Sequence, residues 1–296
     1  MNSVRQSHEG DEISLSHITY VVTDLKTARE TLKKLGFKII FGNYNPAHDV
    51  INSIRLGLGS SFIEITNAPD FPKKSSQGIG IQALGFGTNN IEATQGRLTL
   101  NGFHPLPLIS KNFRMKKPKG EIMESKSRLC WLKEKDMPEV HAEFIQFPPV
   151  QPKKAPSLSP ITLHDNHIVS FNDVILCVSN PEEVVARYCW FTDQGSPQFL
   201  LDRYWKITLY HGSLIICSTS QIDQLHGARN TAKQPTIPGY SLISSNLKKT
   251  KEYFEEVGLK PLKNTKDLLL INLPPAIGGK VFIAEDELAF PWNCNG

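Results

Sequence analysis

Two short segments near the start of the chain each carry one residue suited to metal binding or proton transfer. In SHITYVV, residues 16–22, His17 alternates with apolar neighbours, and in SSFIEIT, residues 60–66, Glu64 does the same. Because successive side chains of a strand face opposite sides, both residues are predicted to point away from the apolar face. An imidazole and a carboxylate that converge can bind a divalent metal with positions left open for substrate oxygens, and Glu64 could instead act as a base.

The alternative for His17 is a half-buried strand histidine that bonds a backbone carbonyl. Glu64 favours the functional interpretation, because a carboxylate in an apolar strand is costly unless it is paired or used. His48 and Asn52 lie between the two strands and are substrate-pocket candidates, although Pro46 and Asp49 mark a loop around His48.

The elements that must position these residues recur four times. Helix starts are predicted at Asp24, Asn90, Asn180 and Asn246, each followed by apolar residues at helical spacing. The interval from Asp24 to Asn90 equals the interval from Asn180 to Asn246, and the interval between the two pairs is longer. Strand-like runs precede and follow each helix. The pattern predicts strand-helix-strand modules arranged as two matched pairs.

Each pair of modules is expected to form one domain, since a helix on a small sheet buries only one side of that sheet. A proline-rich stretch, residues 150–160, is predicted as the linker. We therefore expect a flexible tail at 1–12, a first domain at 13–149 with the candidate active site, and a second domain at 161–296. After the linker, HDNH at 164–167 is interpreted as a turn in preference to a metal cluster.

Composition excludes several classes of function. The 40% hydrophobic and 21% charged residues are typical of a folded soluble protein, and no apolar run approaches the roughly 20 residues that span a bilayer. No signal-type segment begins the chain and the five cysteines show no CxxC spacing, so we expect a cytoplasmic protein. A net charge of +4 with scattered basic residues argues against nucleic-acid binding, and no GxGxxG or GxxxxGK[ST] motif supports a nucleotide cofactor.

The string LSHITYVVTDL followed by NSIRLGLGSSFIEI resembles glyoxalase-like domain proteins of the vicinal oxygen chelate superfamily. The resemblance implies an α+β fold in which four βαβββ modules pair into two glyoxalase-like cupped-sheet domains. It also implies metal ligands on the first and last strands of the modules, where His17 and Glu64 lie.

The second module departs from the family pattern. Its register places Ala83 at the position of His17, with Gln82 beside it, and Gln146 at the position of Glu64, whereas Glu143 is expected to face the other side. Gln82 and Gln146 are therefore substrate-binding candidates. In the second half Asp173 takes the register of His17 and no ligand set is expected, so a structural role is predicted there.

The resemblance implies an enzyme acting on a small oxygenated metabolite, with a divalent metal (Mn, Fe, Zn or Ni) on His17 and Glu64 chelating substrate oxygens. Lyase or isomerase chemistry is preferred to ring-cleaving dioxygenase chemistry. The alternative is a non-catalytic protein of the bleomycin-resistance type that binds or sequesters a small molecule. The expected partner is a small-molecule substrate or ligand, and the oligomeric state stays open, a homodimer included.

Overall fold

The computed structural model describes residues 12–67, 69, 79–148, 163–201, 203–226 and 235–293. It confirms the predicted α+β fold with its repeated strand-helix-strand order. The first module comprises β1 (Ser14–Val21), α1 (Leu25–Lys34), β2 (Ile39–Asn45), β3 (Val50–Leu58) and β4 (Ser61–Thr66). The second comprises β5 (Gly80–Gly87), α2 (Ile91–Leu100), β6 (Ile109–Lys116), β7 (Ile122–Trp131), the 3-10 turn η1 (Glu134–Asp136) and β8 (His141–Gln146).

The second half of the chain repeats this order with small additions. The third module comprises β9 (Ile168–Cys177), α3 (Pro181–Thr192), β10 (Gln198–Leu200), β11 (Tyr204–Thr208), β12 (Ser213–Cys217) and the extra helix α4 (Thr219–His226). The fourth comprises β13 (Thr236–Ser244), α5 (Leu247–Glu256), β14 (Lys263–Asn264), β15 (Leu269–Asn272), β16 (Lys280–Ala284) and the 3-10 turn η2 (Glu287–Ala289).

All four predicted helix starts are the observed N-caps. The side chains of Asp24, Asn90 and Asn246 each accept a hydrogen bond from a backbone amide of the first turn, at 2.9, 3.1 and 2.9 Å. Asn180 makes no such bond, but Pro181 in the first turn fixes a helical φ and lacks an amide that would need a partner.

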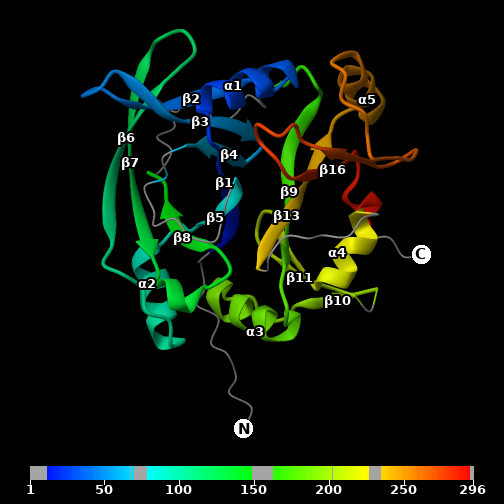
Figure 1. Ribbon diagram of the computed structural model, residues 1–296. Helices are drawn as coiled ribbons and strands as arrows, with labels where there is room; N and C mark the ends of the chain where they lie inside the picture. Colours follow the sequence, from blue (N-terminus) through cyan, green and yellow to red (C-terminus); the bar gives the residue numbers. More distant parts are fainter. Residues whose placement is uncertain are drawn as a thin grey trace.

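The modules pair as the spacing predicts. β1 runs antiparallel to β5, and β9 antiparallel to β13, so each half forms one sheet of eight strands. In the first half the sheet closes into a barrel in the order β1-β4-β3-β2-β6-β7-β8-β5, because β2 also pairs with β6. The second sheet stays open (Figure 1).

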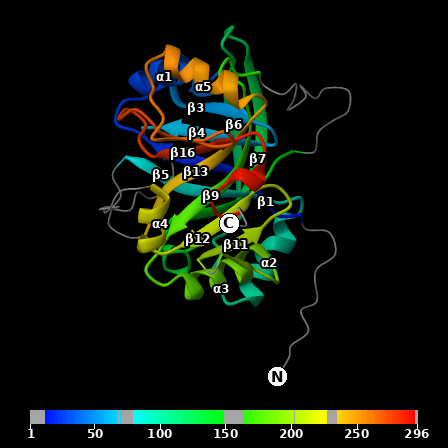
Figure 2. The same ribbon diagram turned by 90° about the vertical axis from the view of Figure 1, so that its right-hand side faces the viewer.

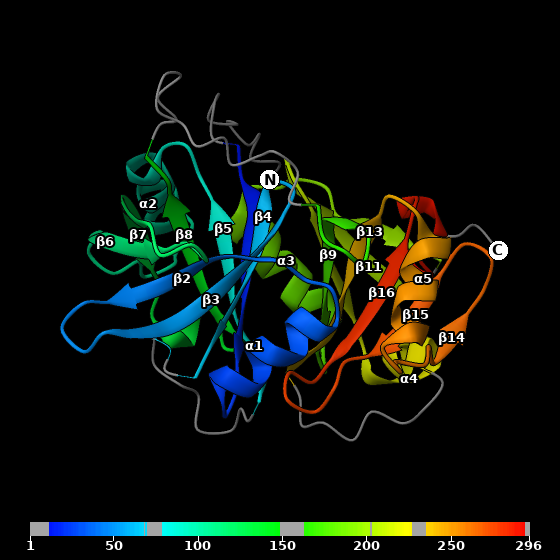
Figure 3. The same cartoon turned by 90° about the horizontal axis from the view of Figure 1, so that it is seen from above.

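Helices from different halves pack against each other at both ends of the molecule. α1 lies beside α5 and α2 beside α3 (Figures 1 and 2). Arg97 of α2 donates from Nη1 to the carbonyls of Trp190 and Phe191 in α3, at 3.1 and 2.9 Å. The Phe191 ring reaches the barrel, with centroids 5.1 Å from Phe86 and 4.7 Å from Phe144. The barrel and the second sheet therefore lie side by side on a shared core (Figure 3).

The HDNH segment is a turn that fastens the second half to the first. His164 accepts from the Lys38 amide at Nδ1, 2.9 Å, and its Nε2 lies 2.8 Å from the Gly57 carbonyl oxygen. Asn166 donates from Nδ2 to the Leu35 carbonyl at 2.8 Å. The predicted linker at 150–160 lies outside the described residues. Among the helices that the structure describes, none is long and apolar enough to cross a membrane.

Candidate active site

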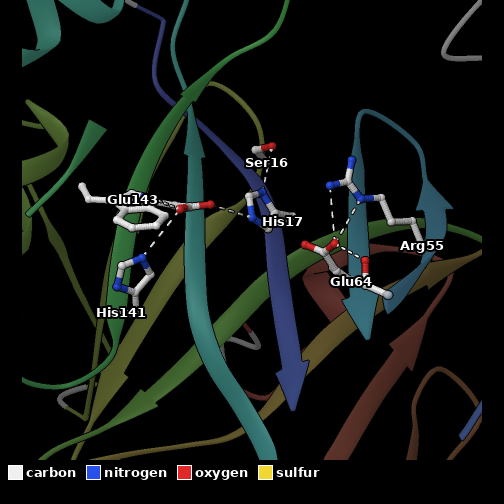
Figure 4. Close-up of polar contacts among 8 residues, drawn as sticks. Ser16, His17, Arg55, Glu64, His141 and Glu143 are labelled. Atoms are coloured by element: carbon white, nitrogen blue, oxygen red, sulfur yellow. Dashed lines mark hydrogen bonds and ion pairs between the residues drawn. The ribbon is translucent and has the colours of Figure 1, made fainter. Parts of the chain in front are cut away.

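The inner wall of the barrel carries six polar side chains that we call the barrel charge cluster. Figure 4 shows most of it, with His17 on β1 between Glu143 of β8 on one side and Glu64 of β4 on the other. Its members are His17, Arg55, Glu64, Lys111, His141 and Glu143.

Glu64 is held by residues of the neighbouring strand β3. The β3-β4 hairpin register sets Arg55 directly opposite Glu64. Glu64 Oε1 accepts from Ser53 Oγ at 2.5 Å and from Arg55 Nε and Nη2, both at 3.4 Å. Burial alone would raise the pKa of Glu64, but the charges of Arg55 and His17 and the bond from Ser53 outweigh it, so the pKa is lowered. The carboxylate is therefore ionised at neutral pH.

Arg55 lies between two aromatic rings. Its guanidinium carbon is 4.6 Å from the ring centroid of Phe62 and 5.1 Å from that of Phe113. Both distances fit cation–π contacts, which are stronger where water is excluded. The side chain keeps only 10% of its surface exposed. Arg55 is thus a permanently charged group fixed inside the barrel.

His17 turns across β5 toward β8. Its Nε2 lies 3.3 Å from Glu143 Oε1 and its Nδ1 3.3 Å from Ser16 Oγ, and its ring stacks on Phe62 at 4.6 Å between centroids. Gly85 makes room for the imidazole, since a Cβ at this position would lie 1.9 Å from His17 Cε1. The glycine on β5 therefore determines where the His17 ring can lie.

Glu143 bridges two imidazoles. Oε1 of Glu143 is the oxygen near His17, and the other oxygen, Oε2, lies 3.6 Å from His141 Nε2. Oε2 also accepts a hydrogen bond from Trp131 Nε1 at 2.6 Å. Burial opposes ionisation, but hydrogen bonds and charge from His141 and His17 hold the pKa of Glu143 well below its usual range. Glu143 is an ionised carboxylate fixed on three sides.

Lys111 of β6 completes the charge cluster. Its Nζ lies 5.1 Å from the Phe113 ring centroid. Burial lowers the pKa of Lys111, while the carboxylates of Glu143 and Glu64 favour its charged form and Arg55 opposes it. Arg55 and Lys111 are thus the two basic side chains that accompany the carboxylates of Glu64 and Glu143.

The expectation that Glu143 faces away from His17 is wrong. Thr19 pairs with Glu64 and Gly85 with Glu143, and Gly85 follows Thr19 at the same interval at which Asn90 follows Asp24. Glu143 is therefore the counterpart of Glu64. The sequence pattern of the last strand instead selects Gln146, whose Nε2 donates to the Asn89 carbonyl at 2.6 Å. The repeat offset applied to the strand pairs was the signal that could have identified Glu143.

The remaining predicted site residues lie apart from the contacts above. Ala83 pairs with Thr19, and Gln82, one position along β5, lies where the β1-β5 register shifts. His48 is an exposed residue of the β2-β3 turn, and Asn52 lies where the β2-β3 register shifts. Their roles in substrate binding stay predictions.

The cluster does not fit a metal centre as its side chains are placed. Within the described ranges, no three His, Cys, Asp or Glu side chains converge so that they could hold a metal ion. His17 is directed to Glu143, whereas Glu64 is directed to Ser53 and Arg55. We therefore derive no chemical step from a metal.

The corresponding place in the second half is filled. Asp173 follows His17 at the same interval that separates Asn180 from Asp24. The buried Asp173 carboxylate accepts from Trp292 Nε1 at 3.0 Å and from Ser241 Oγ at 2.9 Å. Trp292 is itself fully buried. Trp292 thus packs over the position that corresponds to His17, and the structural role of the second half stays a prediction.

Two depressions lie along the first half, one of them at the edge of the cluster. One of about 520 Å³ lies between α2, η1 and α3, far from the barrel interior, and its Arg187 is paired with Glu139 and Glu183. A smaller one of about 90 Å³ is lined by Trp131 and His141 at the edge of the cluster. The Glu64 and Glu143 side chains keep 17% and 13% of their surface exposed. We place the candidate site in the barrel because the carboxylates and cations gather there and both carboxylates keep part of their surface exposed.

Comparison with known proteins assigns the family. Residues 15–192 match the family model described as glyoxalase-like domain. No curated protein matches the chain. A mutant of 4-hydroxymandelate synthase from Streptomyces coelicolor is similar at a TM-score of 0.62 and 13% identity, covering 95% of each chain. A hypothetical protein from Staphylococcus aureus has a TM-score of 0.60 and 13% identity, covering 92% of this chain and 98% of that one.

A third similar structure is the Mn(II)-bound glyoxalase from Novosphingobium aromaticivorans. Its TM-score is 0.55 at 10% identity, over 92% of this chain and 82% of that one. At these identities the solved structures establish the fold alone, while the family model covers more than half of the sequence. The chain belongs to the glyoxalase-like domain family.

Proposed function

We propose that the chain is an enzyme that binds a small oxygenated metabolite inside the barrel and moves a proton on it, as in lyase or isomerase chemistry. The barrel charge cluster is the observation that carries this proposal. Apolar side chains can fill the interior of an eight-stranded barrel, and buried ion pairs are often less stabilising than such residues. Because burying these charged side chains is costly in free energy, their presence in the barrel supports a functional role.

Glu64 is the proposed base. Its Oε1 accepts the bonds from Ser53 and Arg55, whereas Oε2 accepts none from the described residues. Oε2 would take a proton from the carbon next to a substrate carbonyl, and the electrons of that C–H bond would move to the carbonyl oxygen. Return of the proton to a neighbouring carbon gives isomerisation, and departure of a leaving group gives elimination. A positioned base of this kind contributes about 10²- to 10⁴-fold.

The cationic side chains would stabilise the developing negative charge. Arg55 uses Nε and Nη2 on Glu64, and its Nη1 makes no hydrogen bond to a described residue. Its N–H groups and the Lys111 ammonium suit an enolate oxygen. His17, which pairs with Glu143, is the proposed second proton-transfer group of the site. Proton transfer is preferred to ring-cleaving oxygenation, because the cluster presents ionised carboxylates and cations and no converging metal ligands.

Deuterium exchange tests this proposal. We would incubate the protein in D₂O with hydroxyacetone, dihydroxyacetone and pyruvate and follow loss of the C–H signals next to the carbonyl by NMR. Exchange above background in the wild type should fall at least about 100-fold in Glu64→Gln. The control is Glu124→Gln, which alters an exposed carboxylate of the same barrel. Equal exchange in Glu64→Gln and wild type would refute the role of Glu64.

Stoichiometric retention of one of these compounds without exchange would instead favour the sequestering alternative. In that case the charge cluster would be a binding site only. Family relatives support small-molecule binding in either case. A divalent metal on His17 and Glu64, suggested by the Mn(II)-bound relative, stays a prediction that the arrangement of these side chains does not favour.

A further inference from the structure

We propose that Arg55 takes the place of a divalent metal at Glu64 and is the resident cation of the barrel. The inference deepens the proposed function, since it concerns the same site and states which positive charge meets the substrate oxygens. It rests on contacts of Arg55, Glu64 and His17.

The register of the β3-β4 hairpin places Arg55 beside Glu64. The turn at Gly59 and Ser60 joins β3 to β4, and the resulting register makes Arg55 and Glu64 direct partners. Glu64 Oε1 therefore receives three hydrogen bonds, one from Ser53 and two from Arg55. One of the two carboxylate oxygens of Glu64 is thus already occupied by donors from the adjacent strand.

The guanidinium is also held in place from its sides. The Phe62 ring contacts both Arg55, at 4.6 Å from the guanidinium carbon, and His17, at 4.6 Å between ring centroids. Phe113 packs on Arg55 at 5.1 Å. Swinging Arg55 away from Glu64 would break both aromatic contacts and leave Glu64 without its nearest counter-charge, which is unfavourable in a buried place.

A metal ion would also meet unfavourable charge. The guanidinium stays protonated at all ordinary pH values, and the Lys111 ammonium interacts with Glu64 and Glu143 from β6. An ion bound to Glu64 would stand beside both cations. The second predicted ligand, His17, is turned to Glu143 and confined by Gly85. The two predicted metal ligands are thus each paired with another side chain, Glu64 with Arg55 and His17 with Glu143.

Manganese titration of the full-length protein tests this inference without knowledge of the substrate. After removal of metals with EDTA, Mn²⁺ binding would be measured by electron paramagnetic resonance for the wild type, Arg55→Met and Arg55→Lys. Arg55→Met, which keeps length and loses charge, should bind Mn²⁺ about tenfold or more tightly than the wild type. Arg55→Lys keeps the charge and should stay weak.

Two further variants locate the ion. Arg55→Met/Glu64→Gln should return to the weak binding of the wild type, because the freed carboxylate is gone. Arg114→Met is the matched control, since Arg114 pairs with Glu124 on the exposed side of the same barrel. Circular dichroism would verify that each variant is folded, and Arg55→Gln would replace Arg55→Met if the latter does not fold.

Tight stoichiometric Mn²⁺ binding by the wild type that is lost in Glu64→Gln would overturn the inference. So would a folded Arg55→Met or Arg55→Gln variant that gains no affinity. Neither result depends on deuterium exchange, so failure of this inference and failure of the proposed proton transfer are separate outcomes.

Discussion

Replacing Gly85 by alanine should displace His17 from Glu143. A Cβ at this position would lie 1.9 Å from His17 Cε1, 2.2 Å from Nδ1 and 2.5 Å from Nε2. Ordinary contact begins at 3.4 Å, so the imidazole must move by about 1.5 Å. The φ angle of Gly85 lies outside the left-handed region, so the effect is that of the added methyl group and not of backbone strain.

The expected cost follows from two contributions. Forcing a buried ring out of its packed position costs about 1–3 kcal/mol, and weakening its contact to the ionised Glu143 adds about 1–2 kcal/mol. Urea unfolding should therefore show Gly85→Ala less stable than the wild type by about 2–5 kcal/mol. Gly96→Ala is the control, because Gly96 lies inside α2 with open space around it, and it should stabilise by about 0.5–1 kcal/mol.

A double mutant separates the clash from other effects. Once His17→Ala removes the ring, Gly85→Ala has nothing to displace, so His17→Ala/Gly85→Ala should be no less stable than His17→Ala alone. Wild-type stability of Gly85→Ala would refute the reasoning. Additive losses in the double mutant would also refute it, because they would show that the methyl group acts elsewhere.

Three further predictions concern buried groups. Trp292→Ala removes a fully buried ring that stacks on Phe290 and should lower the free energy of unfolding in urea by about 3–5 kcal/mol, whereas a loss below about 1 kcal/mol would contradict its packing. Burial raises the pKa of Asp173, so the stability supplied by its protonated form is lost as pH rises through that pKa. Asp173→Asn should therefore gain stability relative to the wild type as the pH rises above about 4, the usual pKa of Asp, and a constant difference would refute this. The lowered pKa of Glu64 and Glu143 supplies stability that is present above the usual pKa of about 4.3 and is lost on acidification. Glu143→Gln should flatten the fall of the urea midpoint between about pH 5 and about pH 3, and parallel curves would exclude this origin.

Local signals predicted much of the fold. Helix caps and apolar spacing are properties of neighbouring residues, and the four helix starts could be placed for that reason. The equal intervals between helix starts, Asp24 to Asn90 and Asn180 to Asn246, predicted which modules pair. Closure of the barrel through β2 and β6 could not be predicted, because two ladder pairs between distant residues decide it.

The candidate site was predicted in part. His17 and Glu64 lie in the cluster, as strand alternation indicated. Glu143 follows Glu64 at a longer interval than the one between the helix starts Asp24 and Asn90, because the second module is longer before its last strand. The pattern of that strand alone therefore did not identify Glu143. Arg55 was overlooked although the hairpin predicts it, since a two-residue turn at Gly59 and Ser60 sets Arg55 against Glu64.

The position of Phe191 bears on how harmful substitutions in the second half would act. This ring belongs to α3, yet it packs against Phe86, Phe103 and Phe144 of the first half. A substitution that weakens the packing of α3 would therefore remove the Phe191 contacts on the outside of the barrel and leave the side chains of the charge cluster in place. Such changes would lower the amount of folded protein in a cell, while each folded molecule keeps its charge cluster intact. The second half can thus control how much functional barrel a cell contains without contributing a residue to the site.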